Sequence, residues 1–166
     1  AKVRLPEKTK REIDYLIDRV LKDLGLQDKK HLTVGSPVEK VLSGGQRKRL
    51  NIGLELLADP DLFFLDEPTS GLSSGDSESI VKLLSDLADR EKIVFVVIHQ
   101  PSSDIFKRFD KLLLLDVGGK LAYFGGAMEG IRYFKQFLPV KDNFIECPSC
   151  GNANPEIIFN VLEQKE

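Results

Sequence analysis

The sequence contains few cysteines, no long apolar run and no excess of basic residues. Two cysteines in 166 residues are too few for a disulfide framework, which favours a reducing compartment. No apolar run approaches the length of a membrane span, and we expect no signal peptide at the start. The 24 basic and 26 acidic residues give a net charge of −2, which argues against a general nucleic-acid binder. The composition is typical of a soluble globular protein of one ordinary domain.

A further absence is that of acids from the first predicted helical turn in the stretch VLSGGQRKRLNIGLELL, residues 41–57. Its pattern predicts a helix of about fifteen residues that follows Ser43 as N-cap and ends before Pro60. A helix start usually favours Asp or Glu because its free N–H groups are positive, but this first turn has no acid and a basic run comes next at residues 47–49. On its own, the serine could be a plain N-cap and the basic run a solvated helix face.

The same stretch is compatible with a seat for an anion at the helix start. Glycines let backbone N–H groups approach a phosphate closely, the helix N-terminus supplies a positive field, and a serine hydroxyl can donate a hydrogen bond. The residues of this predicted seat are Ser43, Gly44, Gly45 and Gln46.

The periodicity of the first hundred residues predicts a parallel α/β sheet. Thr9 and Glu12 form a capping box before a helical apolar pattern that Gly25 ends. DLFFLDEP (61–68) and KIVFVVIHQP (92–101) are short apolar runs that suit buried parallel strands. A helical period lies between them, and strand, helix, strand is the rhythm of a parallel α/β fold.

The last sixty residues are predicted to form a hairpin and short helices. KLLLLDVGGKLAYFG reads as a hairpin over residues 111–124 that turns at two glycines. Ile131, Phe134 and Phe137 are expected on one face of a short helix, and Asn154–Pro155 is expected to begin a terminal helix.

Polar residues stand where both predicted strands end, which is where ligands bind in parallel α/β sheets. Asp66 comes after an apolar strand and suits a Mg²⁺ ion held through water beside nucleotide phosphates. Glu67 could orient or deprotonate an attacking water, and His99 could donate to a phosphate oxygen. The alternatives are solvated acids at a strand end and a structural histidine. His31 is interpreted as an ordinary surface residue.

Three motifs resemble those of the ATP-binding cassette (ABC) ATPases. LSGGQ resembles the signature motif, LFFLDEPTSGL the Walker B motif running into the D-loop, and VIHQP the switch-histidine loop. Their order and spacing match the family over essentially the whole chain. SGGQRKRLNIGLELL, HQPSSDIFKRFDKLLLL and the late NPEIIFNVL are similar to the G subfamily, the "white"-type half transporters of lipids, sterols, pigments and drugs.

The resemblance implies an α/β fold, a partial P-loop NTPase (RecA-like) parallel sheet with a helical signature subdomain. It implies ATP and Mg²⁺ as cofactors, with Asp66 helping to hold Mg²⁺, Glu67 as the catalytic base and His99 at the γ-phosphate. The implied partners are a second nucleotide-binding domain, in a head-to-tail dimer, and a transmembrane domain. The chain would then lie at the cytoplasmic face of a membrane, and no nucleic acid is expected as a partner. The signature residues that would bind the opposite subunit's ATP are Ser43, Gly44, Gly45 and Gln46, and the D-loop residues are Gly71, Leu72 and Ser73.

The sequence departs from the family's pattern in two places. No G-x-x-x-x-G-K-[ST] motif occurs in these residues, and the only Gly-Lys pair is Gly119–Lys120 in the predicted hairpin turn. We therefore expect a carboxyl-terminal part of a nucleotide-binding domain, with residues 1–59 as helical subdomain and 60–166 as catalytic core. Ser73 stands where the D-loop usually carries Asp, and Asp76 is nearby but offset.

CPSC, from Cys147 to Cys150, has the spacing of half a zinc site. A structural zinc needs four ligands and no second pair exists, so a proline-containing loop is favoured over metal or redox use. Two rivals to a transport ATPase remain open at this point. One is a soluble ABC protein without transport function, and the other is a non-catalytic interaction module.

Overall fold

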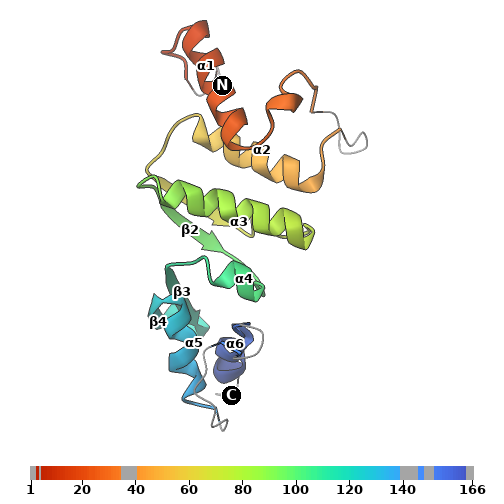
Figure 1. Ribbon diagram of the computed structural model, residues 1–166. Helices are drawn as coiled ribbons and strands as arrows, with labels where there is room; N and C mark the ends of the chain where they lie inside the picture. Colours follow the sequence, from red (N-terminus) through yellow and green to blue (C-terminus); the bar gives the residue numbers. More distant parts are fainter. Residues whose placement is uncertain (1–2, 4, 35–40, 139–145, 148–151, 164–166) are drawn as a thin grey trace. The chain divides into compact units, whose positions relative to one another are not determined.

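The computed structural model describes residues 3, 5–34, 41–138, 146–147 and 152–163 (Figure 1). The chain forms two compact units, Ala1–Ile98 and His99–Glu166, and each is described by itself. The sequence-based boundary at residue 59/60 concerns subdomains of the family and stays a prediction. Within the described residues, no helix is both long and apolar enough to cross a membrane.

The first unit begins with helix α1 (Lys10–Asp23), whose predicted capping box is confirmed. The backbone N–H of Glu12 donates to the Thr9 hydroxyl at 3.4 Å, and the Glu12 carboxylate accepts from the Thr9 N–H at 2.8 Å. The Thr9 hydroxyl also donates to the Glu12 carboxylate at 2.7 Å, and this hydrogen bond, followed by that from the Thr9 N–H, lowers the pKa of Glu12. Gly25 has φ +64°, the left-handed conformation in which glycine ends a helix, as predicted. A short 3₁₀ helix, η1 (Gln27–Lys29), comes next.

Two parallel strands and two further helices complete this unit. Strand β1 (Leu62–Asp66) pairs with β2 (Ile93–Val97) in register, and α3 (Ser74–Ala88) connects them, so the predicted parallel pair is confirmed. Figure 1 shows α2 (Gly44–Leu56) running beside α3. The helices and the inward side chains of the strands share one core: Val20, Leu24, Leu26, Ile52, Leu56, Leu57, Phe63, Ile80, Leu83, Leu84 and Leu87.

The prediction of buried strands is wrong for one face of this sheet. Side chains alternate between the two faces of a strand, and the described helices of the unit cover only the face of Phe63. On the other face Phe64 and Phe95 stack with ring centroids 5.1 Å apart, and Phe64 is 74% exposed. This uncovered apolar face, which we call the open sheet face, consists of Leu62, Phe64, Ile93, Phe95 and Val97.

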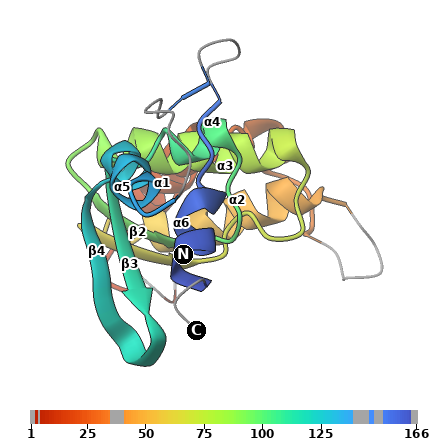
Figure 2. The ribbon, with the colours of Figure 1, turned by 90° about the horizontal axis from the view of Figure 1, so that it is seen from below.

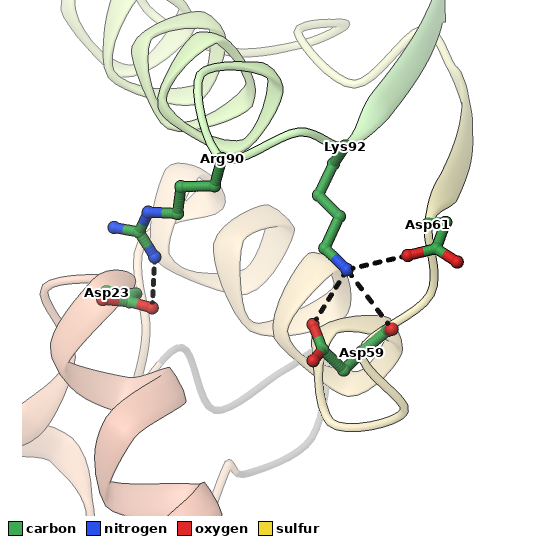
Figure 3. Close-up of polar contacts among 5 residues, drawn as sticks. All are labelled: Asp23, Asp59, Asp61, Arg90 and Lys92. Carbon is green, nitrogen blue, oxygen red and sulfur yellow. Dashed lines mark hydrogen bonds and ion pairs between the residues drawn. The ribbon is translucent and has the colours of Figure 1, made fainter.

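Ion pairs tie the ends of these elements together (Figure 3). The ammonium group of Lys92, just before β2, lies 3.2 Å from a carboxylate oxygen of Asp59 and 3.2 Å from one of Asp61, just before β1. The hydrogen bond to Asp59 contributes most to raising the pKa of Lys92, and the contact with Asp61 adds to it. Arg90 after α3 binds Asp23 at the end of α1 at 2.9 Å. Ion pairs at the surface contribute little stability, so we interpret the two Lys92 contacts as aligning the starts of β1 and β2.

The second unit is built on the predicted hairpin. Strand β3 (Lys111–Asp116) pairs antiparallel with β4 (Lys120–Gly126), as Figure 2 shows, and the turn is the 3₁₀ segment η2 (Val117–Gly119). Gly118 and Gly119 both have positive φ, +76° and +73°, which explains why glycine occupies the turn.

Three short helices share a core with this hairpin. They are α4 (Ser103–Phe106), α5 (Ala127–Lys135) and α6 (Glu156–Glu163). The side-chain oxygen of Asn154 accepts from the N–H of Glu156 at 3.0 Å, which confirms the predicted helix start. The buried residues of this second core are Phe106, Ala127, Ile131, Phe134, Ala153, Ile158 and Val161.

One residue of the predicted apolar face of α5 does not belong to it. Ile131 and Phe134 are buried, but Phe137 is 57% exposed. The helix ends at Lys135, so Phe137 lies beyond the helical repeat and packs against the Tyr133 ring, with centroids 5.4 Å apart.

Candidate nucleotide site

The start of α2 has the geometry that its sequence predicts. Ser43 is the N-cap: its hydroxyl accepts from the Gln46 N–H at 3.2 Å, and the Gln46 side-chain oxygen accepts from the Ser43 N–H at 3.0 Å. The first turn holds no acid. Ser43 and Gly44 are exposed, whereas Gly45 is buried. The side-chain oxygen of Gln46 is thus turned back onto its own helix start, and the exposed part of the predicted seat is Ser43 and Gly44.

A carboxylate from another helix reaches this start, which the sequence-based reasoning did not foresee. The Asp76 side chain, in the first turn of α3, occupies the place where a side chain at Gly45 would stand. A methyl group at Gly44 would lie 3.2 Å from the Leu72 side chain. A side chain at Gly45 would displace the Asp76 side chain, whereas one at Gly44 would only press closely on Leu72. The Asp76 carboxylate thus lies beside Gly45, in a first turn of α2 that carries no acid of its own.

The predicted D-loop forms the turn into α3. Gly71 has φ +72°, and Leu72 is half-buried against Gly44. Ser73 is the N-cap of α3: its hydroxyl accepts from the Asp76 N–H at 3.2 Å and donates to the Asp76 carboxylate at 3.2 Å. The serine at this position therefore holds the offset Asp76 in place beside Gly45.

The two acids at the end of β1 differ in their surroundings. Asp66 is exposed and lies opposite Val97 in the sheet register. Glu67 is half-buried and has φ +44°, a conformation that is uncommon for residues other than glycine and often found at functional sites. Its N–H donates to the Val97 carbonyl at 2.9 Å, and its carbonyl accepts from the Ser70 N–H at 3.1 Å. The sheet edge and the adjoining turn both fix its backbone.

A lysine of α2 also contacts this residue. The Lys48 ammonium group donates to the Glu67 carbonyl at 3.2 Å from a partly buried position. The sequence showed Lys48 only as part of a basic run on a helix, because the contact joins residues 19 positions apart. The hydrogen bond from Lys48 joins the helix α2 to the end of β1, and the packing of Leu72 and Asp76 joins the start of α2 to the D-loop segment and α3.

His99, the other predicted strand-end residue, is exposed and begins the second unit. Its place beside Asp66 and Glu67 stays a prediction. Gln100 beside it has φ +42°, so each predicted strand-end motif contains one residue in the left-handed region.

The cysteine motif lies only partly within the described residues. Cys147 is exposed, and its N–H donates to the Asn152 carbonyl at 2.8 Å, whereas Cys150 lies outside the described ranges. Among the residues that the structure places, no three His, Cys, Asp or Glu side chains are grouped to hold a metal ion.

Comparison with known proteins agrees with these motifs. Residues 2–70 match the protein family described as ABC transporter. The chain is 44% identical to ABC transporter G family member 13 of Arabidopsis thaliana, over 95% of this chain and 22% of that protein. It is 43% identical to Protein white of Drosophila melanogaster, over 93% of this chain and 22% of that protein. The rat "Broad substrate specificity ATP-binding cassette transporter ABCG2" is 41% identical over 81% of this chain and 20% of its own length.

Solved structures show the same fold. The crystal structure of MJ1267, an ATP-binding cassette of an ABC transporter, superposes with a TM-score of 0.63 at 23% identity, over 75% of this chain and 46% of that one. The class that the fold and motifs define is that of the ATP-binding cassettes, P-loop NTPases of the α/β type. The chain belongs to the ABC transporter family, and its nucleotide-binding sequence is of the G-family type. It spans about a fifth of the length of the curated relatives it matches.

Proposed function

We propose that the protein containing this chain hydrolyses ATP to drive a substrate across a membrane. The observation that carries this proposal is the joining of the α2 start, the D-loop and the Glu67 turn within one compact unit. Isolated, each motif has a plain structural interpretation. Together they bring the residues of a phosphate seat and of a strand-end acid pair into one packed arrangement, and the relatives are named as transporters.

In this proposal the two strand-end acids have separate tasks. Glu67 takes a proton from the attacking water, and hydrogen bonds to Val97 and Ser70 hold its backbone. Asp66 is exposed at the strand end and fits a Mg²⁺ ion held through water, because nucleotide-bound Mg²⁺ uses one or two carboxylates besides phosphates and waters. When bound, the ion neutralises charge on the phosphates. His99 donates to the γ-phosphate.

The helix start serves a different nucleotide from the acids. We infer that Ser43, Gly44, Gly45 and Gln46 face ATP held by a second nucleotide-binding domain in a head-to-tail dimer, with Gly71, Leu72 and Ser73 along the same interface. The exposure of Ser43 and Gly44 supports this, because an anion can reach their polar groups. A transmembrane domain would be the other partner, which places the module at the cytoplasmic face of a membrane.

The open sheet face supports the proposal that this chain acts only with the rest of a cassette. Parallel sheets are normally covered on both faces, and here five large apolar side chains remain exposed on one. The motif that cradles the β- and γ-phosphates, G-x-x-x-x-G-K-[ST], is also absent from the 166 residues. Both observations support the proposal that the isolated chain holds only part of an ATP site.

We therefore expect the isolated 166-residue chain to bind ATP more weakly than millimolar and to show no turnover with Mg²⁺. The measurement is a calorimetric titration of the purified chain with ATP, alongside the intact protein under the same conditions. A circular dichroism melt serves as the folding control. Micromolar binding by the isolated chain would contradict its incompleteness, and an intact protein without ATP turnover would contradict the proposed function itself.

A further inference from the structure

We propose that Lys48 is a positioning residue for Glu67, which links the helix that carries the phosphate seat to the acid that activates water. The inference rests on the proposed function and deepens it. Its observation is the hydrogen bond from the Lys48 ammonium group to the Glu67 carbonyl, 3.2 Å long and partly buried.

The backbone of Glu67 needs support because of its conformation. A residue with a Cβ atom at φ +44° is held in the left-handed region, which is sterically unfavourable for residues other than glycine. The Val97 carbonyl holds its N–H, and the Ser70 N–H holds its carbonyl, but both contacts belong to the sheet edge and the adjoining turn. Lys48 supplies a contact from a separate helix.

The chemistry of the contact favours a role beyond a solvated basic face. A hydrogen bond from an ammonium group is stronger than one between neutral groups, and a half-buried lysine is screened less than an exposed one. Lys48 lies about one and a half turns along α2 from Ser43. A displacement of the helix start on phosphate binding would therefore move the Glu67 carbonyl. That movement would in turn change the orientation of the Glu67 carboxylate.

The test compares Lys48→Met and Lys48→Arg in the intact protein with an exposed lysine of α3, Lys82→Met, as matched control. We expect Lys48→Met to lower kcat for ATP hydrolysis about tenfold with KM changed less than about twofold, because a small displacement of a catalytic group is costly. Lys48→Arg, which can still donate to the carbonyl, should restore most of kcat. Lys48→Gln, a polar replacement, provides a second variant if the Met protein does not fold.

A double variant shows whether Lys48 acts through Glu67. In a Glu67→Gln background, Lys48→Met should cause no further loss of the residual turnover, because the group being positioned is already disabled. An equal further loss in that background, or a kcat within about twofold of the unmodified protein for both Lys48→Met and Lys48→Gln, would overturn the proposal. Normal turnover of the Glu67→Gln protein itself would instead overturn the proposed function.

Discussion

Replacing Glu67 by glutamine in the intact protein is expected to lower kcat for ATP hydrolysis about 100-fold or more, the usual contribution of a general base. Glutamine has the size of glutamate and keeps the backbone hydrogen bonds to Val97, Ser70 and Lys48. It cannot take a proton from water at neutral pH. The loss should therefore appear in kcat, while binding of ATP is retained. Steady-state hydrolysis, followed with a phosphate-release assay, gives kcat and KM.

A control variant separates this effect from a general change of charge. Glu78 is an exposed glutamate on α3, so Glu78→Gln removes the same charge from the same unit. We expect that variant to turn over ATP at the rate of the unmodified protein, with an unchanged melting temperature. If the Glu67 and Glu78 variants behave alike, Glu67 is not the base.

Replacing Ser43 by aspartate is expected to lower ATP turnover about 100-fold, because like charges brought together cost several kcal/mol. Aspartate is as good an N-cap as serine, so α2 should still begin at Gly44. Its carboxylate, however, would meet the γ-phosphate that the helix start is proposed to bind. Helix stability and phosphate binding are thereby tested separately, by thermal unfolding and by hydrolysis.

Asparagine at the same position is the matched control. It is equally favoured as an N-cap and has the shape of aspartate without the charge. We expect Ser43→Asn to keep a much larger share of the turnover than Ser43→Asp, and the difference to shrink at high salt if the phosphate lies near solvent. Equal losses in the two variants would mean that the serine hydroxyl or the helix start matters, and not the charge of a bound anion.

The sequence predicts those parts of the molecule that local chemistry decides. Thr9, Ser43 and Asn154 are capping residues because their side chains accept from backbone N–H groups only two or three positions along the chain, and the structure confirms all three. The apolar runs before Asp66 and His99 likewise predict parallel strands. Phe137 shows the limit of a local pattern, because the periodicity extends one step beyond the point where α5 ends.

Contacts between distant residues could not be predicted in this way. The Asp76 carboxylate lies against Gly45, and Lys48 reaches Glu67, because α2, α3 and β1 share one core. The open sheet face could not be predicted for a related reason. An apolar run indicates that both faces of a strand are to be covered, but it does not show which segment or which other chain covers each face. Folding into one core, and not the motifs alone, assembles the candidate site.

The most direct test of the central claim is ATP hydrolysis by a mixed dimer of two differently tagged copies of the intact protein, one with Glu67→Gln and the other with Ser43→Asp. In a head-to-tail dimer one composite site would carry both defects and the other neither. We predict turnover of about half that of the unmodified dimer, if the two sites act independently, although each variant alone is inactive. A mixed dimer as inactive as either parent would contradict the account, because Ser43 and Glu67 would then serve the same nucleotide.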